Sequence, residues 1–314
     1  MTEKYEITAE QNKVMEDLQR MSKKSIPRVA KIQKWTTGVK IEDNNVVELG
    51  LYDCNLTNLP ESISKLTSLQ VLNLGNNQLT TLPEFVTEFT SLKILSLEKN
   101  KLKTLPESIG KLSSLLALYL ERNEISTLPE SIGNLSLLQK IQLNSNKLTN
   151  LPESLGKLSS LYELFSYYNE LMTLPESIGN LSMLKILDLR KNDLETLPES
   201  IGNLSSLLEL YLDKNWLSTL PESIGNLSSL KELYANDNEL STLPESIGHL
   251  SSLKKLYLNG NNLSTLPESL INLKSLEVLD LANNKFYKLS TLPEVIKILE
   301  RMGVSIWGID AIKT

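Results

Sequence analysis

The sequence predicts an α/β solenoid built from eleven stacked repeats of 23 residues. Two observations carry this prediction. One pattern returns every 23 residues from Val46 onwards without insertion or deletion, and leucine supplies most of the apolar content of a chain that is only 5% aromatic. A core assembled by stacking one residue type over many repeats explains both observations. The repeats occupy residues 46–291, between an N-terminal cap (1–45) and a C-terminal cap (292–314).

The first half of each repeat is predicted to be a short strand. Residues 69–79 read L-x-x-L-x-L-x-x-N-x-L, and the pattern recurs at Leu92, Leu115, Leu138, Leu161, Leu184, Leu207, Leu230, Leu253 and Leu276. The fourth and sixth positions are apolar and alternate with polar or variable residues at positions three, five and seven. A period of two residues is that of a β-strand with one buried face.

Asparagine at the ninth position is predicted to turn the chain after each strand. Its side-chain amide can bond the backbone of its own turn and of the adjacent one, which satisfies groups that a tight bend would leave unpaired. The first repeat has Cys54 in this place. The predicted ladder consists of Asn77, Asn100, Asn123, Asn146, Asn169, Asn192, Asn215, Asn238, Asn261 and Asn284.

The second half of each repeat is predicted to be a short 3₁₀ or helical turn. In one repeat Pro106 opens this half, and its fixed φ suits a helical first turn. Ile109 and Leu112 then face inward, and Gly110 permits a tight turn or close packing. Stacking places a parallel sheet on the concave side and the turns on the convex side, and the bulkier turns bend the stack into an arc.

The strand pattern, followed by versions of T-L-P-E-S-I-G-x-L-S-S, resembles the leucine-rich-repeat family over about four fifths of the chain. This resemblance implies a leucine-rich-repeat horseshoe that binds a protein partner. The 23-residue LPESIG form is similar to the intracellular class found in scaffolds of Ras-type GTPase signalling. It implies a small GTPase or its regulator as a candidate partner.

Both ends of the stack need covers. In residues 8–24, Val14, Leu18 and Met21 recur at helical spacing and predict an amphipathic helix. This helix is interpreted as a cap, with a docking role as the alternative. Alternation at Val39 and Ile41, followed by a turn signal at 43–45, predicts a hairpin with the first repeat strand.

The C-terminal cap is predicted to begin with a helix over Pro293–Met302 that ends at Gly303. Val304, Ile306 and Trp307 are then expected to cover the last repeat.

Composition argues against several classes of function. The net charge of −6 does not favour nucleic-acid binding, which needs a basic surface. No apolar run is long enough to cross a membrane, and the N-terminus is polar, so a soluble cytoplasmic protein is expected. Because the chain has one histidine, His249, and one cysteine, Cys54, neither a nucleophile–imidazole pair nor a His/Cys zinc site is expected. The prediction is therefore a non-enzymatic protein without metal or cofactor.

The outward positions of the strands, where the repeats differ, are the predicted binding site. Position five carries a ring in most repeats from the fourth to the tenth, and tyrosine and tryptophan anchor protein interfaces. Ring packing along the ladder is the alternative, and it is compatible with binding. Charges around the rings are mixed, which favours a protein epitope. The predicted concave-face contacts are Tyr119, Phe165, Tyr167, Tyr168, Asp188, Arg190, Tyr211, Asp213, Trp216, Tyr234 and Tyr257.

Two repeats lack leucine at position six, where Ser166 and Ala235 stand. Each leaves volume in the core. Met172 or Met183 is expected to refill the first gap. Two interpretations of these substitutions stay open: the run 165–168 is shifted to present its rings, or the substitutions are tolerated drift. For the whole chain, a monomeric protein-binding scaffold or adaptor is favoured. A self-associating structural spacer and a carbohydrate-binding solenoid remain as alternatives.

Overall fold

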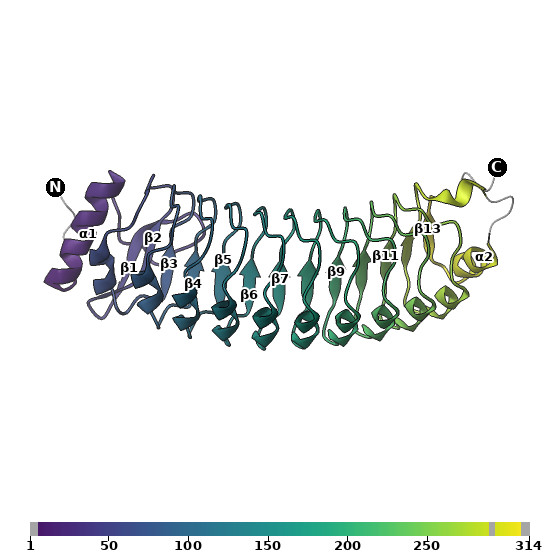
Figure 1. Ribbon diagram of the computed structural model, residues 1–314. Helices are drawn as coiled ribbons and strands as arrows, with labels where there is room; N and C mark the ends of the chain where they lie inside the picture. The colour runs from purple at the N-terminus through teal and green to yellow at the C-terminus, as the bar shows by residue number, and fades with distance from the viewer. Residues whose placement is uncertain (1–5, 289–292, 309–314) are drawn as a thin grey trace. The chain divides into compact units, whose positions relative to one another are not determined.

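A computed structural model describes residues 6–288 and 293–308. The chain forms two compact units, Met1–Leu148 and Thr149–Thr314, called here the N-terminal and the C-terminal unit. Within each unit the strands lie side by side, and 3₁₀ helices line the opposite side of the repeats (Figure 1). The sheet face is defined as the side of the strands that points away from these helices.

In the N-terminal unit, β1 and β2 form an antiparallel hairpin and the strands from β2 to β6 pair in parallel. The strands are β1 (Thr37–Glu42), β2 (Asn45–Leu51), β3 (Val71–Asn73), β4 (Ile94–Ser96), β5 (Ala117–Tyr119) and β6 (Lys140–Gln142). The helices are α1 (Ala9–Ser22), η1 (Glu61–Lys65), η2 (Glu84–Glu88), η3 (Glu107–Lys111) and η4 (Glu130–Asn134).

In the C-terminal unit all strands pair in parallel from β7 to β13. They are β7 (Glu163–Phe165), β8 (Ile186–Asp188), β9 (Glu209–Tyr211), β10 (Glu232–Tyr234), β11 (Lys255–Tyr257), β12 (Val278–Asp280) and β13 (Ser305–Trp307). The helices are η5 (Glu153–Lys157), η6 (Glu176–Asn180), η7 (Glu199–Asn203), η8 (Glu222–Asn226), η9 (Glu245–His249), η10 (Glu268–Asn272), η11 (Lys285–Lys288) and α2 (Glu294–Arg301).

The core of each unit is a stack of equivalent leucines. Leu72 pairs with Leu95, and Leu210 with Leu233, so each repeat lies in register with the next. These position-four side chains are fully buried, as the two-residue period predicts. A single repeat could not bury this face alone, so the stack is the unit of stability.

The turns are 3₁₀ helices, as predicted, but proline does not occupy their first turn. Pro106 has ψ 148°, an extended conformation, and η3 begins one residue later. Its carbonyl accepts the first 3₁₀ bond, from the Ile109 N–H at 3.0 Å. Gly110 packs closely, since a methyl group there would collide with the Ser131 carbonyl. Proline therefore sets the extended entry into the turn.

The N-terminal cap is a helix packed on the first repeat. α1 contacts η1 and β2, and it buries Val14, Met15 and Leu18. The prediction that Met21 faces inward is wrong: its side chain is exposed, because Met15 rather than Met21 lies on the face turned toward the core. The predicted hairpin is present, with its turn at Asp43 and Asn44, both at positive φ.

The C-terminal cap contains a strand that was not predicted. After α2, Gly303 turns the chain at φ +88°, and β13 pairs with β12. Val304 is buried, as expected for a cover. Trp307, in contrast, is 49% exposed. Its register partner is Asp280, which places it in the row of fifth-position residues and on the sheet face.

The two substitutions at position six leave the strand register intact. Ser166 and Ala235 are fully buried. Met172 and Met183 are both exposed, so neither refills the first gap. The predicted shift of residues 165–168 is also absent, because Phe165 pairs with Asp188 in the same register as in other repeats. The Ser166 hydroxyl instead accepts a hydrogen bond from Asn169 Nδ2 at 3.3 Å.

Candidate functional site

The asparagine ladder fixes the strand ends that carry the candidate site. In one representative turn, Asn100 Oδ1 accepts from the Leu79 N–H at 3.0 Å. Its Nδ2 donates to the Leu74 and Leu97 carbonyls at 2.9 and 3.0 Å. Each amide thus joins its own turn to the preceding one, as the sequence pattern predicts, and holds the outward side chains at a fixed spacing.

Three tyrosines and a tryptophan form a continuous row on the sheet face of the C-terminal unit. Tyr211 stacks on Tyr234, and Tyr234 on Tyr257, with ring centroids 4.7 Å apart in both pairs and interplanar angles of 13° and 11°. Trp307 continues the row at 6.2 Å from Tyr257 with a tilt of 56°. The stacking distance matches the separation of neighbouring strands, so the sheet itself sets it. This row is called the ring ladder.

Carboxylates hold the hydroxyls of the ring ladder. Tyr211 Oη donates to Glu209 Oε2 at 2.6 Å, and Tyr234 Oη donates to Glu232 Oε2 at 2.5 Å. Burial and the bonded carboxylate raise the pKa of both tyrosines, so their hydroxyls stay protonated donors. Lys255 pairs with Glu232 at 2.9 Å and supplies a cation beside the rings.

Arg190 covers the free face of the first ring. Its guanidinium lies 4.9 Å from the centroid of Tyr211 and 5.6 Å from that of Tyr167. Two hydrogen bonds of 2.9 and 2.6 Å tie it to the buried carboxylate of Asp188. These bonds raise the Arg190 pKa against the effect of burial. A planar cation held in this way is fixed in orientation before any partner arrives.

A second row of polar side chains runs beside the ring ladder. Asp213 Oδ1 accepts from the Asn236 N–H at 2.9 Å and from its Nδ2 at 2.7 Å. Asn236 Oδ1 in turn accepts from the Asn259 N–H at 2.9 Å. Burial raises the pKa of Asp213, although the bonds from Asn236 oppose that effect. Asp213 therefore positions this row.

The remaining predicted contacts do not join the ring ladder. Tyr119 lies in the N-terminal unit, on β5. Phe165 ends β7 and stands opposite Asp188. Tyr168 is exposed in a turn, with Lys191 over its ring at 5.5 Å. Trp216 lies on the loop after β9. Trp307, in contrast, was predicted only as part of the cap. The one sequence signal for its strand is the neighbouring apolar residue Ile306, which aligns with Leu279 of β12.

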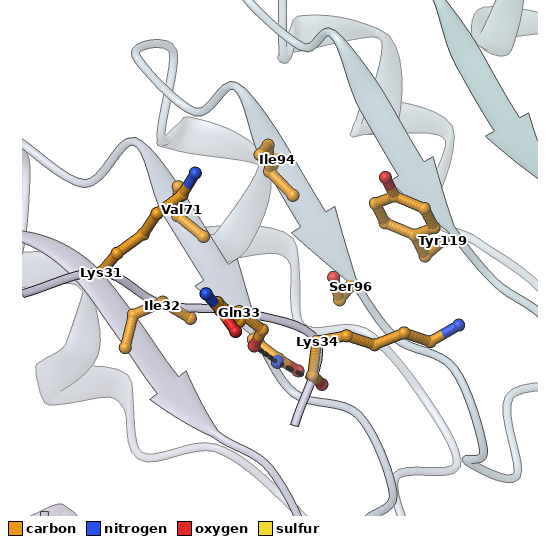
Figure 2. A pocket seen from close by; sticks show the side chains of 9 residues that line it. Lys31, Ile32, Gln33, Lys34, Val71, Ile94, Ser96 and Tyr119 are labelled. Atoms are coloured by element: carbon orange, nitrogen blue, oxygen red, sulfur yellow. Dashed lines mark hydrogen bonds between the residues drawn. The ribbon is translucent and has the colours of Figure 1, made fainter. Parts of the chain in front are cut away.

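In the N-terminal unit the chain covers its own sheet face. Residues 31–34, called the strap, pass in front of β3 and β4, as Figure 2 shows. Asn73 Nδ2 donates to the carbonyls of Gln33 and Lys34 at 2.9 and 2.8 Å. The Ile32 N–H donates to Glu48 Oε2 at 2.7 Å. A cavity of about 390 Å³ remains between the strap and the strands, with Val71, Ile94 and Tyr119 in its lining.

The strap ends over a pair of acids. Lys34 Nζ bonds Glu121 Oε1 at 2.7 Å. Glu98, on the neighbouring repeat, is 1% exposed, and neither carboxylate oxygen has a hydrogen-bond partner within the described residues. Burial raises the pKa of Glu98 to about 7, and the Glu121 carboxylate adds to this effect while Lys34 and Lys99 oppose it.

The nucleophilic and metal-binding residue types lie apart. Cys54 is buried, and burial raises the pKa of its thiol, which lowers its reactivity. His249 is exposed at the end of η9. In residues 6–288 and 293–308, no three His, Cys, Asp or Glu side chains are grouped to hold a metal ion. Over the same residues, no helix combines the length and apolar character needed to cross a membrane.

Models of leucine-rich repeats match most of the repeated part of the chain. A model described as a leucine-rich repeat region matches residues 48–120 and 166–239. Two further leucine-rich repeat models match residues 241–286, and residues 229–250 and 275–299. Together with the stacked strands, these matches show that the chain is a leucine-rich-repeat protein with a solenoid fold. Among curated proteins, no sequence matches it.

Several solved structures share this fold. One is the leucine-rich-repeat ectodomain of the receptor kinase GASSHO1/SCHENGEN3 from Arabidopsis thaliana in complex with CASPARIAN STRIP INTEGRITY FACTOR 2. It has 25% identity and a TM-score of 0.68, over 95% of this chain and 46% of that one. The PEPR1–AtPEP1 structure has 31% identity and a TM-score of 0.70, over 93% and 47%. The chain thus spans about half the length of these two relatives.

An internalin (inlF) from Listeria monocytogenes is similar over nearly its whole length. Its identity is 20% and its TM-score 0.67, over 97% of this chain and 92% of that one. At this identity the likeness shows the fold alone. The fold class is therefore shared by proteins of quite different origin, and the functional argument has to come from the site.

Proposed function

We propose that this chain is a protein-binding scaffold that holds a protein or peptide partner against the ring ladder of its C-terminal unit. The ring ladder carries the proposal. Tyrosine and tryptophan bury large rigid areas at small entropic cost, and they dominate protein interfaces. The structures of GASSHO1/SCHENGEN3 with CASPARIAN STRIP INTEGRITY FACTOR 2 and of PEPR1–AtPEP1 support a proteinaceous partner.

The ring ladder is already assembled without a partner. Stacking fixes each ring, and Glu209 and Glu232 fix two of the hydroxyls. A partner that docks here does not have to order these side chains, which lowers the entropic cost of binding. Because the ring faces contact one another, the partner meets ring edges together with the acids and Lys255. This mixed surface suits a protein epitope better than a polyanion.

We further propose where the scaffold acts and which class of partner it takes. The 23-residue LPESIG form supports a cytoplasmic scaffold whose partner is a small GTPase or its regulator. A non-enzymatic role is supported by the exposed position of His249 and the burial of Cys54, which keep the two residues from acting as a pair.

The test is a triple variant of the ring ladder. Replacing Tyr211, Tyr234 and Tyr257 by alanine should weaken binding of a captured partner at least about 100-fold, since each ring is expected to be a binding hot spot. Affinity capture from native lysate with mass spectrometry identifies the partner, and calorimetry with the purified partner measures the loss. Circular dichroism confirms that the variant still unfolds cooperatively.

A double variant of Leu137 and Met183 to alanine is the matched control. Both side chains are exposed and lie in turns that follow 3₁₀ helices rather than on the strands, so their replacement should leave binding unchanged. Unchanged affinity in the triple tyrosine variant would contradict the proposal. A self-associating spacer would instead appear as a concentration-dependent dimer in light scattering, and the triple variant would dissociate it.

A further inference from the structure

The loop edge of the C-terminal unit carries an exposed indole outside the ring ladder. Trp216 stands at the tenth position of its repeat and is 55% exposed. Its backbone N–H bonds the Leu194 carbonyl at 2.9 Å, so the loop that carries it is fixed. Its Nε1 donates to Asp193 Oδ1 at 3.3 Å, which orients the indole. Among the described residues, no other aromatic ring stacks on it.

Trp216 lines a groove with excess negative charge. The other lining residues include Asp193, Lys214, Asp237, Glu239 and Gly260, and none of the ladder rings is among them. Lys214 lies 3.8 Å from Asp237, which leaves Asp193 and Glu239 without a cation in the groove. These two acids occupy the tenth positions of the repeats before and after Trp216, so they flank the indole.

A glycine keeps the groove open. Gly260 has φ +69°, and any side chain there would collide with the Asp237 carboxylate. A residue with a side chain would therefore be strained at this position and would also displace a lining acid. An open space beside an oriented indole with two flanking carboxylates is the arrangement that attracts a cation over an aromatic face.

We propose that this groove is a second docking site that takes an arginine side chain of a protein partner. A guanidinium can lie flat on the indole and donate several N–H groups toward the flanking carboxylates, whereas a lysine ammonium is a strongly hydrated point charge. The site is separate from the ring ladder in its residues and in its chemistry. It stands or falls independently of the function proposed above.

The probe is the peptide acetyl-Gly-Arg-Gly-amide, titrated into the full chain. The three tryptophans, Trp35, Trp216 and Trp307, give three indole N–H signals in a ¹H–¹⁵N spectrum, and the Trp216→Phe variant assigns the one of interest. The Trp216 signal should shift saturably while the other two remain in place. Glu239→Gln should raise the dissociation constant about fivefold, because one of the two carboxylates without a cation partner in the groove is lost.

Three controls make the result decisive. The same peptide with glutamine in place of arginine should leave Trp216 unmoved. Trp216→Leu keeps an apolar side chain but should abolish binding of the arginine peptide. Because this variant has no Trp216 signal, binding is measured as NMR saturation transfer from the protein to the peptide. Tyr234→Ala, in the ring ladder, should leave the titration unchanged. An unmoved Trp216 signal, an equal shift with the glutamine or a lysine peptide, or an unaltered constant in Glu239→Gln would each overturn the proposal.

Discussion

The two units present the same kind of sheet face in different states. In the N-terminal unit the fifth-position residues Gly50, Asn73 and Ser96 are buried, and the strap crosses in front of them. In the C-terminal unit the equivalent residues Tyr211 and Tyr234 are half-buried, and they are covered by neighbouring rings and by the Arg190 guanidinium. One face is closed by the chain itself, and the other is an assembled surface without a cover in the described residues.

The difference lies in side-chain size at one repeated position. Position-five residues without rings let the strap approach, and the strap carbonyls of Gln33 and Lys34 accept hydrogen bonds from the Asn73 side chain. Stacked rings exclude such an approach, since they fill the space above the strands. The interior is the same in both units, because both are built from the same leucines and asparagines. A repeat protein can thus assign cover and binding to different stretches without altering its frame.

The largest expected effect on stability comes from the asparagine ladder, which both units share. Asn77→Ala in the N-terminal unit and Asn215→Ala in the C-terminal unit should each cost about 3 kcal/mol, because each removes an amide that satisfies several buried backbone groups. Urea unfolding of both variants measures the cost. Exposed Lys101→Ala serves as the neutral control. A large difference between the two asparagine variants would mean that the frame is not shared.

The covered face should respond to pH through Glu98. Its pKa of about 7 lies above the ordinary 4.5 of an unfolded glutamate, so the folded state holds a proton that the unfolded state has lost. Stability should therefore fall as the pH rises from about 4.5 to about 7. Glu98→Gln removes this loss and should stabilise the protein by about 2–3 kcal/mol at pH 8, with little effect near pH 4.5.

Urea titrations at the two pH values separate this effect from a general one. Glu107→Gln, an exposed acid at the start of η3, is the matched control and should change neither value. Equal stabilisation by Glu98→Gln at both pH values would show that the buried charge is not the cause.

Much of this molecule could be predicted because its signals are local and repeated. Strand, asparagine turn and 3₁₀ helix each follow from a few residues and recur with each repeat. Trp307 was missed because β13 follows β12 by 27 residues instead of 23, which breaks the period. The strap was missed because its contacts with Asn73 join residues about 40 apart that share no pattern. The burial of Glu98 depends on the space above Gly75 in the preceding repeat, which no single repeat reveals.

The smallest expected effect on stability comes from Tyr234→Phe, on the sheet face of the C-terminal unit. This change keeps the stack and removes the bond to Glu232, so stability at pH 7 should fall by only about 0.5–1 kcal/mol. Although burial opposes it, the bonds from Tyr234 and Lys255 hold the Glu232 pKa below its usual value. A carboxyl group whose pKa is lower in the folded than in the unfolded state stabilises the fold at pH values above its unfolded-state pKa. This contribution is lost as the pH falls through the folded-state pKa.

The difference in stability between wild type and Tyr234→Phe should therefore be present at pH 7 and shrink as the pH falls below 4.5 and Glu232 becomes protonated in both proteins. Tyr52→Phe, outside the ring ladder, tests whether any lost hydroxyl has the same effect. A loss of several kcal/mol in Tyr234→Phe would mean that the hydroxyl bonds, rather than the stacked rings, hold this face together, and the ring ladder would then be assembled by its acids.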